Sequence, residues 1–469
     1  MFFQDTLFFG HLGRSGWWPS MENLIRGEIE NRVNTCHLLF CDFEYSCCEA
    51  NKRGLREDCG ECTRITKNFF YENFSIEERK FLKPLSLQEA SEWRFQDAIN
   101  VADKINISNY LKSVAEFKTL TYMDFKQLGY GVISSLFTNF VRPFDDENID
   151  LVKYNTVLKN LTVNSIATYL IVKSYIQKHN INKAYIWNGR MAYPRAVIAA
   201  CQELGVDWYV VETGHKYGYY SKYFRTLAHD INCWKNRVRS TWQAIGNMPE
   251  SREIANKFYT DRPNKALNDF INLQTKGFLP QKVVKNKKQQ EKVKNIVVYL
   301  TTNRESMSIS PGLDSYSLFL SQINAVKFLV EHYKGQEREV NLIIREHPNQ
   351  KISNPALVFL TMPEYAKFVT LLTPDSPVDS YELMREADLI ITFHSTIGIE
   401  AAYWKREKAI QLKPSNYFTG LEVTTIPRSE EELIKLLDSP PGKVTESNFE
   451  DVLAYGYYMS TFGDKINNR

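Results

Sequence analysis

The sequence has 469 residues, which at roughly 100–200 residues per domain is too long for one compact core and indicates about two to four domains. Hydrophobic residues make up 43% and charged residues 24%, with 21 Gly and 17 Pro, and these proportions exclude collagen-like, low-complexity and wholly disordered chains. The 58 Lys and Arg residues nearly balance the 55 Asp and Glu residues, so the formal charge of +3 does not indicate a nucleic-acid-binding protein.

Targeting signals are not evident in the sequence. No stretch approaches the roughly 18–20 consecutive apolar residues of a membrane-spanning helix, and the first residues lack the basic flank and apolar block of a signal peptide. We therefore expect a cytoplasmic protein. A run with six lysines and one Glu between Lys282 and Lys294 is typical of a solvated connector, and it could also dock the chain at the inner face of an anionic membrane.

The chain opens with a pattern typical of a βαβ unit. An apolar strand over residues 6–9 leads into the glycine-rich turn 10–16, a helix begins near Pro19, and a second strand covers residues 37–40. The turn falls short of both G-x-G-x-x-G and the P-loop, so we reject these nucleotide motifs. Arg14 in this turn is a candidate for binding a substrate.

Six of the eight cysteines fall within the first 62 residues. One C-x-x-C pair together with the cysteines upstream could hold a structural zinc or an iron–sulfur cluster in the segment 41–62, which we expect to be a loop. The alternative is a set of reduced thiols in a polar loop, because a zinc knuckle usually has two such pairs. The four candidate metal ligands are Cys41, Cys48, Cys59 and Cys62.

Residues 87–181 have mostly helical periodicity and form an expected helical insertion. A strand over 184–187, a helix over 194–204 and a strand over 208–211 then predict a parallel crossover. The chain is polar from about residue 250 to 295. We place a domain boundary in that stretch, with an N-terminal domain over 1–280 and a basic linker over 281–295.

A second run of alternating strands and helices follows the linker. Five apolar strands end at about residues 300, 344, 371, 392 and 412, and helices are expected between them, including one from Tyr316 to Tyr333. This pattern predicts an α/β protein with two doubly wound Rossmann-like domains facing a central cleft. The second domain covers 296–430, and a helical tail covers 431–469.

Ligands of open parallel sheets bind where the strands end, so three loops of the second domain are candidate donor sites. Thr301, Thr302 and Asn303 could offer hydroxyls and an amide to a phosphate, although the same residues also suit an ordinary polar turn. Arg345 and His347 follow the next strand. Pro348 biases His347 away from helical backbone, which gives its imidazole a defined direction for contacting phosphate or ribose.

The third loop runs from a strand into a helix at Ser395 and Thr396. Their hydroxyls and the N–H groups of the first turn suit an anion, and Gly398 allows close approach of helix and ligand. Glu400, one turn further on, could accept hydrogen bonds from ribose. The alternative is a Ser/Thr cap on a buried helix.

The pairing of His347-Pro348 with a later Ser395-Thr396 helix cap resembles the bacterial sialyltransferases and capsule Kdo transferases, which are GT-B glycosyltransferases that use CMP-activated sugars. The resemblance covers about residues 184–220 and 296–418. It implies that the His-Pro motif contacts the nucleotide and that the Ser-Thr motif contacts its phosphate.

The same relatives carry an acidic residue near a Gly in the N-terminal domain, where it acts as general base on the acceptor hydroxyl. Glu212 corresponds to it, although Thr213 separates it from Gly214 and departs from the doubled acidic pattern of the family. A structural carboxylate is the alternative. The candidate acceptor-binding residues besides Arg14 are Asn188, Arg190 and His215.

These features predict a glycosyltransferase of bacterial surface polysaccharide synthesis, with a nucleotide-sugar donor and a glycan or lipid-linked acceptor. Glu212 would act as base, and His347 with the helix N-terminus at Ser395 would stabilise the leaving phosphate, so no cofactor is needed for catalysis. Three alternatives stay open: a sugar-nucleotide 2-epimerase, a CDP-glycerol-type glycerophosphotransferase, and a scaffold without activity.

Overall fold

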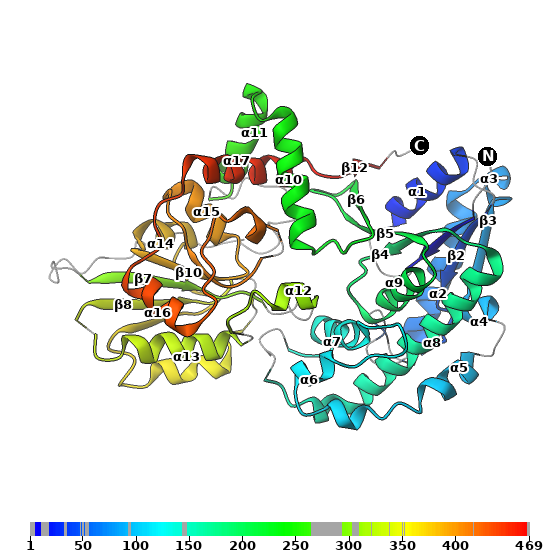
Figure 1. Cartoon of the computed structure of the whole chain (residues 1–469), viewed down its shortest axis with the longest axis horizontal. Coiled ribbons are helices and arrows are strands. Elements are labelled where there is room, and N and C mark those ends of the chain that lie inside the picture. Colours follow the sequence, from blue (N-terminus) through cyan, green and yellow to red (C-terminus); the bar gives the residue numbers. More distant parts are fainter. Residues whose placement is uncertain are drawn as a thin grey trace. The chain divides into compact units, whose positions relative to one another are not determined.

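The computed structural model describes residues 5–10, 18–31, 35–46, 48, 51, 56–91, 95–142, 148–263, 293–302, 309–319, 321–336, 338–348, 350, 352–415 and 417–466. The chain divides into two compact units, each an α/β fold around its own sheet (Figure 1). Unit 1 consists of residues 1–228, 307–310 and 462–469, and unit 2 of residues 229–306 and 311–461. The prediction of an α/β protein with two parallel-sheet domains is confirmed.

Unit 1 has the strand order β12-β6-β5-β4-β1-β2-β3 in its described part, and β1 to β5 are parallel to one another. The predicted opening βαβ unit and the crossover at residues 184–211 are confirmed. The strands are β1 (Thr6–Phe9), β2 (Cys36–Phe40), β3 (Leu82–Ser86), β4 (Lys183–Trp187), β5 (Asp207–Thr213), β6 (Tyr219–Phe224) and β12 (Asp464–Lys465).

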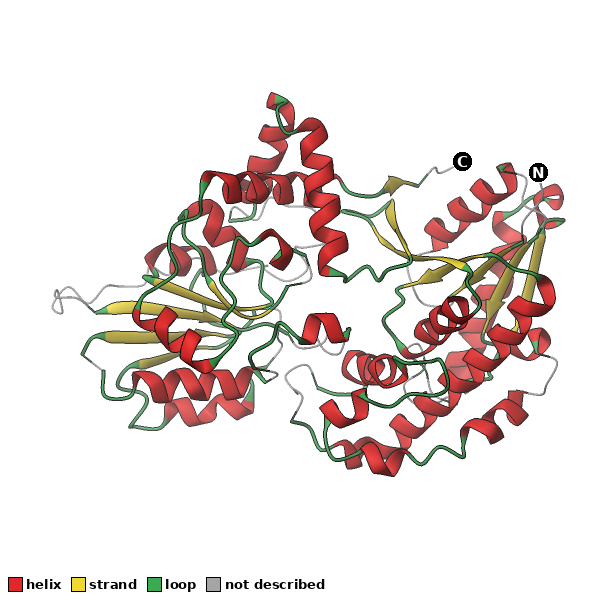
Figure 2. Cartoon of the chain, viewed as in Figure 1, coloured by secondary structure: helices red, strands yellow, loops and turns green. Residues whose placement is uncertain are grey.

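Helices surround this sheet, and the predicted helical stretch between residues 87 and 181 is present as α4 to α8 (Figure 2). The helices of unit 1 are α1 (Trp18–Glu30), α2 (Arg56–Asn73), α3 (Ile76–Arg79), α4 (Leu87–Ala90), α5 (Phe95–Ala102), α6 (Val114–Lys118), α7 (Leu128–Asn139), α8 (Asn155–His179) and α9 (Ala192–Glu203).

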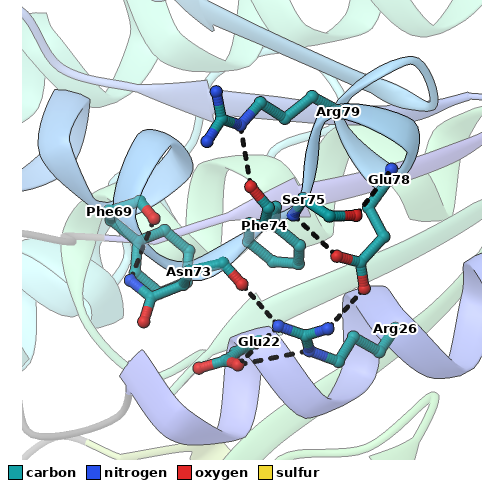
Figure 3. A network of polar contacts seen from close by, with 8 residues as sticks. All are labelled: Glu22, Arg26, Phe69, Asn73, Phe74, Ser75, Glu78 and Arg79. Carbon is teal, nitrogen blue, oxygen red and sulfur yellow. Dashed lines mark hydrogen bonds and ion pairs between the residues drawn. The ribbon is translucent and has the colours of Figure 1, made fainter.

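A polar network fastens α1 to the corner between α2 and α3 (Figure 3). The guanidinium of Arg26 contacts the carboxylates of Glu22 and Glu78 and lies 5.2 Å from the ring centroid of Phe74. Glu78 also accepts from the backbone N–H of Ser75 at 2.8 Å, while the Ser75 hydroxyl accepts from the Glu78 N–H at 3.3 Å. This reciprocal capping box starts α3 and sets the direction in which the chain enters β3.

Unit 2 contains a five-stranded parallel sheet in its described part, with the order β11-β10-β7-β8-β9. All five strands were predicted, to within about two residues at each end. They are β7 (Lys294–Tyr299), β8 (Val340–Arg345), β9 (Val369–Leu372), β10 (Leu389–Phe393) and β11 (Ile410–Lys413).

Both faces of this sheet are buried, because side chains alternate along each strand. Ile296 and Val298 of β7 pack with the cluster that includes α13 and α16, whereas Val297 and Tyr299 pack with the cluster that includes α14 and α15. The helices of unit 2 are α10 (Ile231–Ile245), α11 (Pro249–Asp261), α12 (Pro311–Asp314), α13 (Gln322–Tyr333), α14 (Ser380–Glu386), α15 (Ile397–Trp404), α16 (Glu430–Asp438) and α17 (Glu446–Thr461).

The division of the chain differs from the expected boundaries. Residues 229–261 were assigned to the N-terminal domain, but α10 and α11 group with unit 2. Buried Phe258 and Tyr259 of α11 pack near α17, and the Tyr259 hydroxyl donates to the carbonyl oxygen of Val452 at 2.7 Å. The polar stretch predicted from about residue 250 is therefore helical at least to residue 261, and most of the lysine run lies outside the described residues.

Candidate functional site

The strand order of unit 2 places a topological switch point between β7 and β10. The chain runs outward from β7 to β8 and β9 on one side and from β10 to β11 on the other, so the loops that follow β7 and β10 diverge at the carboxyl edge of the sheet. Ligands of open parallel sheets bind at this position. The predicted loops at Thr301 and Ser395 are the two that flank it.

The loop after β10 enters α15 through the two predicted hydroxyl residues. Ser395 Oγ accepts from the backbone N–H of Ile397 at 3.3 Å, so this side chain caps the helix. Thr396 is the N-cap residue of α15 and makes no side-chain cap. Its hydroxyl oxygen instead accepts from Nη2 of Arg262 at 3.2 Å. The guanidinium of Arg262, the residue that directly follows α11, therefore lies at the first turn of α15.

Arg262 also forms a buried ion pair with Glu400. Its Nε lies 3.0 Å from Glu400 Oε1, and the two side chains are 10% and 1% exposed. Burial lowers the pKa of Arg262 and the charge of Glu400 raises it, and the net result is a pKa above the ordinary value, so the guanidinium stays charged. Glu400, expected to bind ribose, is thus engaged with a cation that we did not identify from the sequence.

Sequence reasoning missed Arg262 because it lies within the polar stretch from about residue 250 to 295, in which no element was predicted, 134 residues before Thr396. The available signal was the helical spacing of the buried residues Ser251, Ala255, Phe258 and Tyr259. That spacing predicts a helix whose last turn would present Arg262. Its partners come from a distant part of the chain and could not be inferred.

Gly398 supports the close packing of α15. A Cβ at this position would lie 3.1 Å from Thr424 Cγ2 and 3.3 Å from Thr392 Oγ1, so a side chain would push the helix away from its neighbours. Gly398 therefore allows α15 to approach neighbouring parts of the protein closely, and its predicted close approach to a ligand stays a prediction.

The predicted donor-binding residues near the ends of β7 and β8 include two, Thr301 and Arg345, that are hydrogen-bonded within the protein. Thr301 is buried, and its N–H and C=O each bond the side-chain amide of Gln322 at 2.9 Å. Thr302 is partly exposed, and Asn303 lies outside the described residues. Arg345 is buried and donates to the carbonyl oxygens of Thr373 and Ser376, at 2.5 and 3.5 Å. Arg345 thus braces the carboxyl edge of β8, and its predicted contact with a donor stays a prediction.

His347 is followed by Pro348 in a turn. Burial, followed by the charge of Arg345, lowers the pKa of His347 from about 6.5 to about 4. The imidazole is therefore neutral at physiological pH in the absence of a ligand, and it can donate or accept a hydrogen bond without contributing a positive charge.

This lowered pKa predicts an acid destabilisation of unit 2. Between pH 6.5 and 4 the unfolded chain binds a proton at His347 that the folded chain does not, so stability falls as the pH falls through this window. Between pH 7 and pH 4.5 we expect the free energy of unfolding to fall by about 2–3 kcal/mol less in His347→Gln than in the wild type. Urea unfolding of both proteins at the two pH values measures this difference, and an equal fall in the two proteins would contradict the prediction.

Unit 1 has its own switch point, between β1 and β4. In the sequence the glycine-rich turn 10–16 comes after β1, and its residues 11–16, including Arg14, lie outside the described part of the chain. The loop after β4 contains Asn188, Gly189 and Arg190. Asn188 and Gly189 have positive φ angles of 62° and 74°, and a Cβ at Gly189 would lie 2.7 Å from Val210 Cγ2. Only glycine fits at this second position.

The left-handed backbone at Asn188 brings two predicted residues together. Asn188 Nδ2 donates to Glu212 Oε1 at 2.5 Å, and the Asn188 N–H donates to the carbonyl oxygen of Val211 at 3.0 Å. Glu212 was expected in a loop after the strand, but β5 continues through Thr213 because it pairs with β6 on its other side. The carboxylate is therefore held on a strand with an amide donor fixed against it.

The other acceptor-side candidates are more enclosed. Arg190 is 5% exposed, and its carbonyl oxygen accepts from Arg195, which is 2% exposed. Burial and then the charge of Arg190 lower the pKa of Arg195 to about 9. His215 Nδ1 donates to the carbonyl oxygen of Phe462 at 2.7 Å, so this ring fastens the end of the chain to unit 1.

The cysteines do not all lie in a loop as expected, because α2 begins at Arg56 and carries both Cys59 and Cys62. Asn51 donates from its backbone to Cys48 Sγ at 3.2 Å and from its amide to Cys59 Sγ at 3.0 Å. Burial raises the pKa of the Cys41 thiol. Within the described ranges, no three His, Cys, Asp or Glu residues form a metal-binding group. Metal binding by this cluster stays a prediction.

A pocket of about 180 Å³ lies at the opposite edge of the sheet of unit 2. Its lining includes the start of β10 and the segment just before β11, with Asp388, Glu407, Lys408 and Lys443. The pocket is thus separated by the length of the strands from the switch-point loops.

None of the helices among the described residues combines the length and hydropathy needed to cross a bilayer.

The sequence matches no protein-family model, and no curated protein matches it significantly. Solved structures with a similar arrangement include the UDP-GlcNAc 2-epimerase from Neisseria meningitidis bound to UDP-GlcNAc, at 9% identity over 96% of each chain with a TM-score of 0.28. They also include the UDP-GlcNAc 2-epimerase from Methanocaldococcus jannaschii with UDP-GlcNAc and UDP, at 11% identity over 95% of this chain and 97% of that one, with a TM-score of 0.26. The glycosyltransferase SnogD from Streptomyces nogalater matches at 10% identity over 98% and 95%, with a TM-score of 0.20. Scores this low carry no argument about activity.

Proposed function

We propose that the chain is a glycosyltransferase that moves a sugar from a nucleotide-activated donor, with a cytidine nucleotide favoured, to a glycan or lipid-linked acceptor of bacterial surface polysaccharide synthesis. The observation that carries the proposal is the guanidinium of Arg262, which donates to Thr396 at the first turn of the helix α15 that Ser395 caps. These groups lie at the switch point of the unit 2 sheet, and they suit the phosphate end of such a donor.

The chemistry of the leaving group supports a reaction without a metal ion. When the sugar's anomeric carbon–oxygen bond breaks, the electron pair stays on the phosphate oxygen, and the nucleotide gains negative charge. The N-terminus of α15 supplies positive potential at that end, and Arg262, whose charge is balanced by Glu400, offers guanidinium N–H donors there. His347 would add a hydrogen bond rather than a charge, because its pKa lies well below neutrality.

Glu212 supports the acceptor half of the reaction. In our proposal its carboxylate takes the proton of the acceptor hydroxyl as that oxygen bonds to the anomeric carbon. The amide of Asn188 orients Glu212 by donating to Oε1. This assignment places acceptor activation in unit 1 and donor binding in unit 2.

A thermal-shift screen with CMP, CDP, UDP, GDP and dTDP tests donor binding. A ligand that binds only the native state raises its stability by about 2.7 kcal/mol at 100 times its Kd. We expect a cytidine nucleotide to raise the melting temperature most. Arg262→Lys, which keeps a charge but loses the geometry that contacts both Thr396 and Glu400, should reduce the shift. The absence of any nucleotide-dependent shift in the wild type would contradict the proposal.

Product analysis separates the alternative reactions. Wild-type protein incubated with a nucleotide sugar but no acceptor should leave the sugar unchanged, and isomerised nucleotide sugar would instead indicate a 2-epimerase. With an acceptor present, a mass increase of one sugar residue supports transfer. A mass increase of one glycerophosphate unit from CDP-glycerol would assign the glycerophosphotransferase reaction in its place.

A further inference from the structure

Arg195 is a buried cation whose partners in the described part of unit 1 are all neutral. It lies in the first turn of α9 and is only 2% exposed. Nη1 donates to Oε1 of Gln127, and Nη2 donates to the carbonyl oxygens of Arg190 at 3.2 Å and of Ile309 at 2.8 Å. Nε is buried without a hydrogen-bond partner. Among the described residues, the guanidinium is therefore kept from water without a negative partner.

This burial is unfavourable for a charged group. Buried charges in proteins are as a rule paired, because the interior does not replace the solvation that water supplies. Burial and then the charge of Arg190 lower the pKa of Arg195 to about 9, so the guanidinium is still protonated at neutral pH. The carbonyl and amide oxygens around it satisfy N–H groups but do not balance the charge. An anion at the same place would do both.

The guanidinium faces the N-terminal end of α9. Its contact with the carbonyl oxygen of Arg190 places it there, because Arg190 directly precedes Met191, the N-cap residue of the helix. Met191 makes no side-chain cap, and the helix dipole adds positive potential at this end. The stem of Arg195 is held by α7, since a Cβ at Gly131 would lie 3.1 Å from Arg195 Cβ. The charge is thus fixed beside the loop that follows β4, at the switch point of unit 1.

Gln127 is the exposed member of the three partners of Arg195. Arg190 and Ile309 are buried and contribute backbone carbonyl oxygens, which the fold keeps in place. The Gln127 oxygen belongs to a side chain at the surface, so it can turn away into water at little cost. A ligand oxygen that takes its place would reach Nη1 of Arg195 from the outside.

We propose that Arg195 binds an oxyanion of the acceptor, a phosphate or a carboxylate, whose oxygen replaces Gln127 Oε1 on the guanidinium. The inference rests on the proposed function, because it names the chemical class of the acceptor as an anionic glycan or lipid-linked sugar. The position fits, since the loop that contains Arg190 also contains Asn188, which orients the base Glu212. One loop of unit 1 thus serves both the negative group of the acceptor and the base.

Two anionic sugars test the site and identify its ligand. Glucuronate carries a carboxylate, glucose 1-phosphate carries a phosphate, and glucose is the neutral control. Titration calorimetry is performed with saturating CDP, so that the proposed donor site of unit 2 is filled. We expect at least one of the anionic sugars to bind the wild type, and the tighter one identifies the oxyanion. Glucose should bind more weakly than that sugar.

Arg195→Met should raise the Kd of the tighter sugar at least about tenfold, which corresponds to the loss of one charge-assisted hydrogen bond. Met keeps an unbranched apolar stem against Gly131, and it removes a buried charge that has no counter-ion, so we expect the variant to fold. Binding of neither anionic sugar by the wild type, or the same Kd in Arg195→Met, would overturn the inference.

Gln127→Glu tests the site with the guanidinium left in place. The introduced carboxylate can pair with Arg195 from within the protein, so we expect a higher melting temperature than in the wild type and a loss of affinity for the anionic sugar of at least about tenfold. Gln127→Ala is the matched control. It removes the covering oxygen and should bind the sugar at least as tightly as the wild type. Unchanged affinity in Gln127→Glu would contradict the inference.

The inference and the proposed function fail separately. Arg195-dependent binding of an anionic sugar by a protein that binds no nucleotide would overturn the proposed function and leave the anion site standing. Binding of CDP by a protein that binds neither anionic sugar would overturn the anion site alone.

Discussion

Glu400→Gln is expected to destabilise unit 2 by about 3–5 kcal/mol, because it leaves the buried charge of Arg262 without its counter-ion. The pair is nearly closed to water, so the solvent cannot replace the lost carboxylate. Urea unfolding monitored by tryptophan fluorescence measures the change. Glu446→Gln is the matched control, since Glu446 is 93% exposed in its contact with Arg406, and we expect it to change stability by less than about 0.5 kcal/mol.

A double variant separates stability from ligand binding at this pair. Arg262→Met combined with Glu400→Gln removes both charges, so it should recover most of the stability that the single variant loses. It should still fail to bind CDP, because the cation proposed to hold the phosphate is absent. A double variant that binds CDP as well as the wild type would show that Arg262 does not contact the nucleotide.

Glu212→Gln is expected to lower turnover by about 10²- to 10⁴-fold, the range over which a positioned general base contributes. Gln keeps an oxygen that can accept from Asn188 Nδ2, so the fold and the CDP affinity should stay close to those of the wild type. The measurement is the initial rate of sugar transfer at saturating donor. The same rate in the variant and the wild type would assign Glu212 a structural role.

Asn188→Gly provides a graded control for the same carboxylate. Glycine keeps the positive φ of 62° but removes the amide that orients Glu212. We expect a loss of about tenfold in turnover, smaller than that of Glu212→Gln, because the base is present but less well positioned. A loss larger than that of Glu212→Gln would mean that Asn188 itself contacts the substrate.

The fold could be predicted where the pattern along the chain is sufficient to define an element. The strands of unit 2 are short apolar runs, and β10 at the centre is buried along its whole length, so their positions follow from hydropathy alone. β6 was missed because Tyr219–Phe224 does not alternate apolar and polar residues: two aromatic pairs flank Ser221 and Lys222, at the edge of the parallel strands. β12 has only two residues, too few for any periodicity to be visible.

The sequence was sufficient to predict which loops form the candidate site, but not which side chains contact one another in it. The rule that ligands bind at strand ends identified the loops at Asn188, Glu212 and Ser395, and the structure places Asn188 against Glu212. It could not reveal that Arg262 pairs with Glu400, because that contact joins elements far apart in sequence. The direction of a polar side chain depends on partners from other elements, and no local pattern records them.

The most direct test of the central claim is a crystal structure of the protein with bound CDP. We predict that the diphosphate lies at the carboxyl edge of the unit 2 sheet, within hydrogen-bonding distance of Arg262, Ser395 and Thr396. Density for the nucleotide at the amino ends of β10 and β11, or anywhere in unit 1, would contradict the account.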